Sequence, residues 1–255
     1  GKSKARMPRS LILTPTRELA QQISDTFEKF SKFHNLSLAL LIGGVPFSEQ
    51  DRKLNRGVDV LIATPGRLLD HFERGNILFN SVKILVIDEA DRMLDMGFIP
   101  DIEKIHKVLP KIRQTLFFSA TLSSQIRKIG ERFVMNPKII EVAPPSSTSK
   151  NIDQNLVMCE KKDKINILCK LLKNTKLDRV VIFCNRKKDI DSLSSSLKKN
   201  NLNSIILHGD MTQSSRNKSL TLFKDGNMKT LIASDVAGRG LDIENISHVF
   251  NFDVP

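Results

Sequence analysis

Short runs of apolar and β-branched residues recur along the chain, with amphipathic segments between them. In the first half these runs predict six strands: Ser10–Thr14, Ser37–Ile42, Val58–Ala63, Lys83–Ile87, Thr115–Phe118 and Lys138–Val142. Apolar residues at helical spacing also predict a helix over Arg17–Phe33. Strands that alternate with helices are typical of βα units and of a parallel sheet.

The stretch APPSSTSK at residues 143–150 interrupts this periodicity, and we interpret residues 143–152 as an interdomain linker. The alternation then resumes with predicted strands at Asp153–Met158, Arg179–Cys184, Ser204–Leu207, Thr230–Ala233 and His248–Phe252. Predicted helices lie between them at Asp163–Leu172, Lys188–Lys199 and Ser214–Phe223. The pattern therefore predicts two α/β domains with doubly wound parallel sheets, residues 1–142 and residues 153–255.

Composition places the chain among ordinary globular proteins, with 40% hydrophobic and 27% charged residues. No run approaches twenty apolar residues and no charged-then-apolar leader is present, so we expect no membrane span, no signal peptide and a cytoplasmic location. Cys159, Cys169 and Cys184 are odd in number and lack a CxxC spacing. They predict neither a disulfide framework nor a zinc site.

The formal net charge of +12 favours a polyanionic partner. Residues 1–142 contain 22 Lys and Arg against 16 Asp and Glu, and residues 143–255 contain 18 against 12. The positive charge is thus shared evenly, and a polyanion that contacts both halves is favoured. Because the chain has no Trp and no Tyr, contact with a sugar-phosphate backbone is favoured over stacking on bases.

Acidic residues follow one of the predicted strands directly. Asp88, Glu89 and Asp91 come after the apolar run 84–87. Ligands bind at the carboxyl edge of open α/β sheets, and Mg²⁺ on a nucleoside triphosphate prefers oxygen ligands there. A solvated acidic turn would explain the tetrapeptide DEAD alone, and the surrounding motifs favour phosphoryl chemistry.

Three strand-to-helix junctions in the first half have phosphate-binding chemistry. PTRELA at residues 15–20 opens a helix with Thr16 and Arg17, GG at residues 43–44 permits close backbone approach, and ATPGR at residues 63–67 adds another cation. Each alone is explained by a helix cap or a turn. Together, at the ends of consecutive strands, they favour a groove for a nucleic-acid backbone.

SAT at residues 119–121 emerges at the same predicted edge as the acidic residues, where its hydroxyls could hold Asp91 by hydrogen bonds. A simple helix cap is the alternative. The second half contributes HGDMTQSSR at residues 208–216 and SDVAGRGLD at residues 234–242. His208 has no neighbouring metal ligands and is interpreted as a structural histidine.

In this order, the motifs PTRELA, GG, ATPGR, DEAD, SAT, HGDMTQSSR and SDVAGRGLD resemble the DEAD-box ATP-dependent RNA helicases of superfamily two, over nearly the whole chain. The segments RMLDMGF at 92–98 and FNFDVP at 250–255 are similar to bacterial RhlE-like members. The resemblance implies two RecA-like domains, ATP with Mg²⁺ between them, and single-stranded or locally duplexed RNA across both. Ribosome-assembly or RNA-decay proteins are open as partners, since no motif selects one.

The resemblance also implies roles at the nucleotide. Asp88 would hold Mg²⁺ through water, and Glu89 would position or activate the attacking water. Nucleotide state would be coupled to domain closure by Asp91, Ser119 and Thr121. The nucleotide would be contacted from the second domain by Gly240 and Asp242.

For RNA, the resemblance implies contacts from the first domain by Thr16, Arg17, Gly44, Thr64, Gly66 and Arg67. From the second domain it implies contacts by Gly209, Gln213, Arg216, Ser234 and Asp235. Gly238 stands where the family commonly has alanine, a departure that we expect to be mild.

Three family segments are not found in the sequence. Gly1-Lys2-Ser3 matches the end of the phosphate-binding loop GxxxxGKS/T, but no strand precedes it and Pro8 leaves no room for a helix before Ser10. The arginine segment HRxGRxGR and the adenine-reading Q segment are also not found. We therefore expect both domains to be incomplete and this fragment to be inactive alone. A nonenzymatic RNA-binding relic and a DNA-directed translocase of the same superfamily stay open as alternatives to a helicase.

Overall fold

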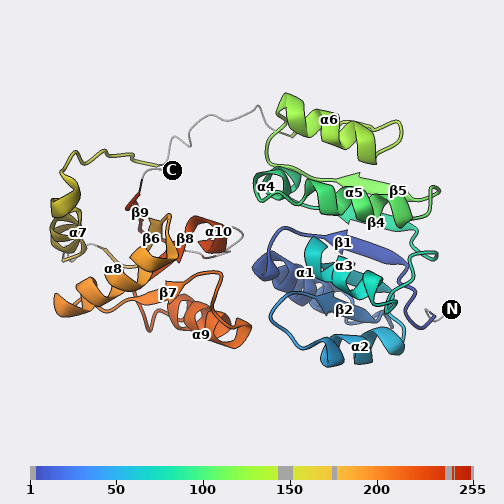
Figure 1. The fold of residues 1–255 in the computed structure, drawn as a ribbon, viewed down its shortest axis with the longest axis horizontal. Coiled ribbons are helices and arrows are strands. Elements are labelled where there is room, and N and C mark those ends of the chain that lie inside the picture. The colour runs from blue at the N-terminus through green and yellow to red at the C-terminus, as the bar shows by residue number, and fades with distance from the viewer. Residues whose placement is uncertain (1–3, 143–151, 174–176, 239–242, 244, 254–255) are drawn as a thin grey trace. The chain divides into compact units, whose positions relative to one another are not determined.

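The computed structural model describes residues 4–142, 152–173, 177–238, 243 and 245–253, with the backbone alone at residues 235 and 236 (Figure 1). The chain divides into two compact units, unit 1 at Gly1–Ile152 and unit 2 at Asp153–Pro255. Each unit is built around a parallel sheet, of five strands in unit 1 and four in unit 2. This confirms the prediction of two α/β domains with parallel sheets.

In unit 1 each strand is followed by one helix, or by two after the fourth strand. Its strands are β1 (Ser10–Leu13), β2 (Leu38–Leu41), β3 (Val60–Ala63), β4 (Ile84–Ile87) and β5 (Gln114–Phe117). Its helices are α1 (Arg17–Phe30), α2 (Phe47–Asn55), α3 (Pro65–Glu73), α4 (Ala90–Asp95), α5 (Ile99–Val108) and α6 (Ser124–Phe133). The strands pair in the order β2-β3-β1-β4-β5.

Successive side chains of each strand face opposite layers of unit 1, because side-chain direction alternates along a strand. Val60 and Ile62 of β3 pack in a cluster with Ala20 of α1. Leu61 of the same strand packs in the larger cluster with Leu68 of α3, which also includes core residues of α2, α4, α5 and α6. Helices cover both faces of the sheet, and β2, β3 and β4 are accordingly continuous apolar runs.

Unit 2 repeats this design on a smaller scale. Its strands are β6 (Val180–Cys184), β7 (Ile205–Leu207), β8 (Thr230–Ser234) and β9 (His248–Asn251), paired in the order β7-β8-β6-β9. Its helices are the 3-10 turn η1 (Lys161–Asp163), α7 (Lys164–Leu172), α8 (Lys187–Lys199), α9 (Gln213–Lys224) and α10 (Asp235–Gly238). Val180 and Ile182 face the α7 and α8 side, whereas Val181 packs with Phe223 of α9.

Two predicted strands are wrong. Residues 138–142 and 153–158 are described by the structure, and neither segment is in a strand. Their apolar side chains are exposed, for example Val142 at 94% and Met158 at 84%, so the β-branched pattern has no core to face. The predicted helix 17–33 also ends early, at Phe30.

The linker at 143–152 falls almost wholly outside the described residues, as do Gly1–Ser3. Within the described part of the chain, no helix combines the length and apolar character needed to cross a bilayer.

Candidate functional site

The carboxyl ends of neighbouring parallel strands meet at one edge of the unit 1 sheet. β1 and β4 pair in register up to Leu13 and Ile87, and the amide of the next residue, Asp88, donates to Leu13 O at 3.0 Å. The amide of Thr14 donates in the same way to Ala63 O at 3.0 Å, at the end of β3. The loops with PTRELA, ATPGR, DEAD and SAT therefore begin along the same edge, where open α/β sheets bind ligands.

Asp88 is half-buried directly after β4. Its Oδ1 accepts a hydrogen bond from the Glu89 amide at 3.0 Å. Burial raises the pKa of Asp88, the Glu89 amide opposes this, and the nearby Asp91 carboxylate raises it further. A cation at this place would favour the ionised carboxylate, because it would offset both the burial and the like charge.

Glu89 lies at the start of α4 in the left-handed region, with φ 51° and ψ 53°. A non-glycine residue there costs about 1–3 kcal/mol, and such strain is concentrated at functional sites. Its Oε2 pairs with Arg92 Nη1 at 3.1 Å. Burial raises the pKa of Glu89, and Arg92 opposes that rise. The strained turn thus holds a carboxylate with raised proton affinity beside Asp88.

The third carboxylate, Asp91, joins the loop after β4 to the loop after β5. Its Oδ2 accepts hydrogen bonds from the backbone amide and from Oγ1 of Thr121, both at 3.1 Å. Ser119 Oγ donates to Thr121 O at 2.8 Å and so shapes the same turn. Asp91 and Thr121 are therefore in contact, and Ser119 acts on Thr121 instead of on Asp91.

The donor set fits a magnesium ion that is held mainly by water and phosphate oxygens. Among the described residues, no three His, Cys, Asp or Glu side chains converge as a metal cage. Mg²⁺ in nucleotide sites usually keeps several waters and uses only one or two carboxylates. The half-buried Asp88, whose pKa is raised by burial and by Asp91, is such a carboxylate.

Two further motifs of unit 1 lie together. Thr16 caps α1, its Oγ1 accepting from the Leu19 amide at 3.2 Å. The Arg17 guanidinium packs on Gly43, where an added Cβ would lie 3.0 Å from Arg17 Nη2. Gly44 has φ 82°, which favours glycine. The structure thus brings Arg17 to the GG loop, and Gly43 makes the close approach.

The third corner, ATPGR, opens α3 with Thr64 at the N-cap and Pro65 at the first helical position. Gly66 has open space where a Cβ would be. Arg67 is engaged inside the unit: its Nη1 donates to Val45 O at 2.8 Å, and its guanidinium carbon lies 4.2 Å from the centre of the Phe47 ring. Burial lowers the pKa of Arg67, and Asp70 opposes this. Arg67 therefore organises the GG loop in this structure.

In unit 2, the motif HGDMTQSSR forms the turn into α9. Gly209 is exposed, and Gln213 is the first residue of the helix after the Thr212 cap. Arg216 is 4% exposed and donates from Nη1 to His208 O at 2.9 Å. Its guanidinium thus supports the turn that carries Gly209.

The motif SDVAGRGLD is described in part. Ser234 ends β8, is buried, and its Oγ accepts from the Ala237 amide at 3.3 Å. Asp235 begins the short helix α10. The predicted nucleotide contacts Gly240 and Asp242 lie outside the described residues.

Comparison with family models decides the classification. The model "DEAD/DEAH box helicase" matches residues 2–129, and "Helicase conserved C-terminal domain" matches residues 163–255. The chain belongs to the DEAD/DEAH box helicase family. The predicted family is thereby confirmed.

Two bacterial proteins are among the curated relatives of this helicase family chain. The chain is 41% identical over 252 residues to "ATP-dependent RNA helicase CshA" of Listeria monocytogenes, covering 99% of this chain and 48% of that protein. It is 40% identical over 251 residues to "ATP-dependent RNA helicase RhlB" of Pseudomonas putida, covering 97% of this chain and 63% of that protein. The chain therefore spans about half to two thirds of the length of these relatives.

Solved helicase structures show the same fold. "S. cerevisiae Dbp5 bound to RNA and ADP BeF3" matches with a TM-score of 0.87 and 31% identity, over 98% of this chain and 64% of that one. "DEAD-box helicase Mss116 bound to ssRNA and UDP-BeF" matches with a TM-score of 0.84 and 31% identity, over 98% and 55%.

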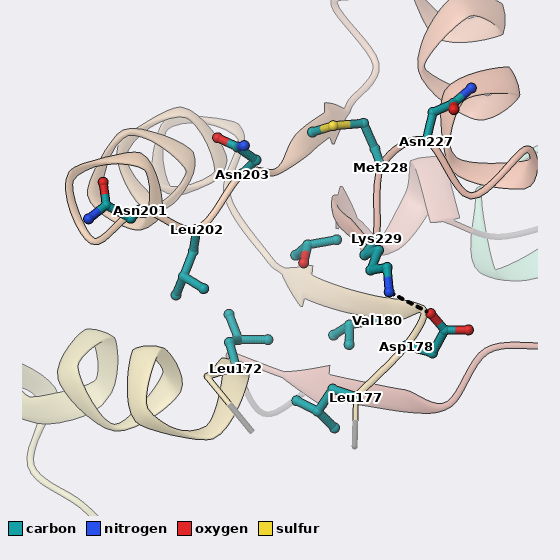
Figure 2. Close-up of a pocket in the computed structure, with 11 residues that line it drawn as sticks. Leu172, Leu177, Asp178, Val180, Asn201, Leu202, Asn203, Asn227, Met228 and Lys229 are labelled. Carbon is teal, nitrogen blue, oxygen red and sulfur yellow. Dashed lines mark ion pairs between the residues drawn. The ribbon is translucent and has the colours of Figure 1, made fainter. Parts of the chain in front are cut away.

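A cavity of about 300 Å³ in unit 2 of this DEAD-box chain lies away from the motifs (Figure 2). Its lining includes Asp178 and Val180 at the start of β6 and Lys229 and Thr230 at the start of β8. The cavity therefore opens at the amino ends of the strands, whereas the helicase motifs follow their carboxyl ends.

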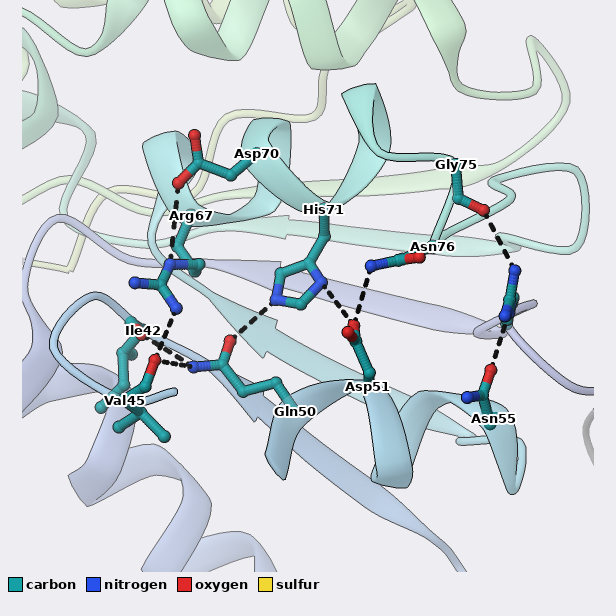
Figure 3. A network of polar contacts seen from close by, with 11 residues as sticks. Ile42, Val45, Gln50, Asp51, Asn55, Arg67, Asp70, His71, Gly75 and Asn76 are labelled. Atoms are coloured by element: carbon teal, nitrogen blue, oxygen red, sulfur yellow. Dashed lines mark hydrogen bonds and ion pairs between the residues drawn. The ribbon is translucent and has the colours of Figure 1, made fainter. Parts of the chain in front are cut away.

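Sequence reasoning missed several polar residues beneath the GG loop. Gln50 of α2 and His71 of α3 are buried and in contact, and both connect to the loop (Figure 3). The sequence signal was weak: each is a polar residue in an amphipathic helix, and only the packing of α2 against α3 shows that they meet.

Proposed function

We propose that the chain is the core of an ATP-dependent RNA helicase, which couples RNA-stimulated ATP hydrolysis to local unwinding of RNA duplexes. One observation carries this: the acidic loop after β4 shares a sheet edge with the loops of PTRELA and ATPGR, and Asp91 joins it to SAT. Phosphoryl chemistry and nucleic-acid backbone contacts thus arise on adjacent loops.

At the nucleotide, Asp88 would hold Mg²⁺ through water, and Glu89 would orient or deprotonate the attacking water. When bound, the ion would neutralise charge on the phosphate oxygens of ATP. Asp91, Ser119 and Thr121 would transmit the nucleotide state, since their hydrogen bonds link two loops of the same edge. From unit 2, Gly240 and Asp242 would contact the nucleotide.

RNA would be bound through its sugar-phosphate backbone. The bacterial relatives are named RNA helicases, and the similar yeast structure contains RNA. In unit 1 the contacting residues would be Thr16, Arg17, Gly44, Thr64, Gly66 and Arg67. In unit 2 they would be Gly209, Gln213, Arg216, Ser234 and Asp235.

We further propose that the protein works in the cytoplasm. Cys159, Cys169 and Cys184 are free thiols, and Cys169 and Cys184 are buried. Burial raises the pKa of Cys184 to about 12, so this thiol stays protonated and unreactive. Unpaired thiols of this kind are typical of a reducing compartment.

The function is tested on the full-length protein by measuring phosphate release from ATP with single-stranded RNA, with single-stranded DNA and without nucleic acid. A helicase of this family should be stimulated by RNA and should also separate a short RNA duplex. Stimulation by DNA alone would identify a DNA-directed translocase. RNA binding without any ATP turnover would identify a nonenzymatic RNA-binding protein.

A further inference from the structure

A buried amide lies beneath the loop that contains Gly43 and Gly44 (Figure 3). Gln50 is 3% exposed, and its Nε2 donates to Ile42 O at 3.0 Å and to Val45 O at 3.2 Å. These two carbonyls flank the glycines on either side. One side-chain amide therefore fixes both ends of the loop.

His71 fixes the orientation of that amide. Its Nε2 lies 2.9 Å from Gln50 Oε1. Because the Gln50 NH₂ group donates to two carbonyls, its oxygen must accept, and we infer that His71 Nε2 carries the proton. Burial lowers the pKa of His71, although Asp51 opposes this, so the neutral ring is favoured. His71 Nδ1 lies 3.2 Å from Asp51 Oδ1, and this contact opposes the fall of the His71 pKa.

The network of polar contacts from His71 through Gln50 ends at backbone carbonyls of the Gly43–Gly44 loop and not in the core. Val45 O accepts from Gln50 and also from Arg67 Nη1, at 2.8 Å. Asn76 Nδ2 donates to Asp51 Oδ1 at 2.8 Å and so holds the outer side of the network. A network that served only to join α2 to α3 would not require hydrogen bonds to the loop carbonyls.

The position of the loop determines where Arg17 can lie. The Arg17 guanidinium packs directly on Gly43, so an added Cβ, 3.0 Å from Arg17 Nη2, would push the guanidinium aside. Gly44 turns the backbone with φ 82°, which glycine adopts readily, and a glycine pair needs contacts from its surroundings to hold one position. A displaced loop would therefore displace Arg17.

We propose that Gln50 and His71 are positioning residues for RNA binding, which hold the Gly43–Gly44 loop so that Arg17 meets the sugar-phosphate backbone. The inference rests on the proposed function, because RNA is the ligand that Arg17 contacts. Both side chains are buried and act only through the loop. Without them, RNA binding would have to order the loop, and the affinity would fall accordingly.

The test measures affinity for uridine-rich single-stranded RNA in the presence of a nonhydrolysable ATP analogue, on the full-length protein. Gln50→Met and His71→Leu should each weaken RNA binding on the order of tenfold and leave affinity for the analogue unchanged. His71→Gln should stay within about threefold of the wild type, because its amide can still donate to Gln50. The matched control is Ile105→Val, a core change on α5 that lowers the thermal midpoint and should leave RNA affinity unchanged.

A double variant identifies the route of the effect. Gly43→Ala adds a Cβ on the loop that displaces Arg17 directly. Because Gln50→Met is expected to displace the same side chain, the double variant should lose no more RNA affinity than the weaker-binding single variant. Additive losses would overturn the inference, as would RNA affinity within about twofold of the wild type in Gln50→Met. If Gln50→Met does not fold, equal affinities of His71→Leu and His71→Gln would overturn it instead. A wild-type protein that does not bind RNA would refute the proposed function itself.

Discussion

Glu89 holds a backbone conformation that few residues other than glycine adopt, and it does so between two other carboxylates. The strain costs stability of about 1–3 kcal/mol, which the surrounding packing of β4 and α4 must offset. The DEAD sequence alone predicts the carboxylates at the end of a strand. The left-handed turn, which aims the Glu89 side chain, becomes visible only in the structure.

We expect Glu89→Gln in the full-length protein to keep nucleotide binding and to slow ATP hydrolysis by about two orders of magnitude. The carboxylate that orients or deprotonates water is lost, while Asp88 is unchanged. Asp88→Asn should in addition weaken Mg²⁺-dependent nucleotide binding. Steady-state phosphate release and nucleotide titration measure the two effects.

Glu103→Gln provides the matched control, since Glu103 is a surface carboxylate that pairs with Arg132 at 3.2 Å on another helix pair. The same chemical change there should leave turnover unaffected. Normal turnover in Glu89→Gln would assign Glu89 a purely structural role.

The packing of Phe183 explains why a glycine is favoured at position 238 in this chain. A Cβ at this position would lie 2.2 Å from Cε1 of Phe183, which fills the space. We expect Gly238→Ala to lower the free energy of unfolding of unit 2 by about 1–3 kcal/mol through overpacking. Phe183→Leu should relieve the clash, so the double variant should lose less free energy of unfolding than the two single variants lose together. Urea denaturation followed by circular dichroism tests this, and a neutral Gly238→Ala would show that the ring moves aside.

Histidines make the stability of unit 1 depend on pH. Burial lowers the pKa of both His71 and His106 from 6.5. Below pH 6.5 the unfolded chain takes up protons that the native histidines resist, so their contribution to stability is full above pH 6.5 and is lost as the pH falls below it. The free energy of unfolding should therefore decrease from pH 7.5 to pH 5.5. His71→Gln and His106→Gln should each flatten this dependence, and an unchanged slope in both variants would contradict the assignment.

At the scale of elements, the strands that are buried on both faces, such as β3, β6 and β8, could be predicted from their apolar runs. The predicted run at Val58–Ala63 became β3, whose four residues are all buried. Residues 138–142 and 153–158 also contain apolar and β-branched residues but do not form strands. Strand formation needs a neighbour in the sheet, and a local pattern does not contain that information.

The meeting of Gln50 with His71 could not be predicted for a related reason. They lie on two helices, and their contact depends on how α2 and α3 pack. The sequence predicted that Arg67 contacts RNA, but it did not show that the Arg67 guanidinium also donates to Val45 O. The residue types were therefore recognisable, but their partners depended on tertiary packing.

The junction of β4 with β5 is where we expect nucleotide state to be coupled to unwinding. Thr121→Val removes the hydroxyl that donates to Asp91 and keeps the backbone amide that also donates to it. We expect RNA-stimulated ATP turnover to stay within about threefold and duplex unwinding to fall about tenfold, since one hydrogen bond to a charged group is lost. Thr115→Val on β5 is the control for the same chemical change. Parallel losses of both activities would show that the contact supports catalysis alone.

At the scale of the whole molecule, the positive charge is distributed evenly along the chain. Both halves, residues 1–142 and 143–255, have an excess of Lys and Arg, and neither is a basic tail. The chain has no Trp or Tyr to stack on bases. These features favour a ligand that is recognised through its phosphates, with contributions from unit 1 and from unit 2.

We therefore expect RNA affinity to be insensitive to sequence and to depend on residues of both units. Arg17→Gln should weaken binding of different homopolymeric RNAs nearly equally and should lower the magnitude of the salt slope by about one unit, because one phosphate contact is lost. Gln213→Ala in unit 2 should weaken binding without changing the slope, since this side chain is neutral. Affinity against salt concentration measures both, and Arg132→Gln, an exposed arginine on α6, is the charge-matched control. A strong preference for one homopolymer, or full affinity in Gln213→Ala, would contradict backbone recognition by both units.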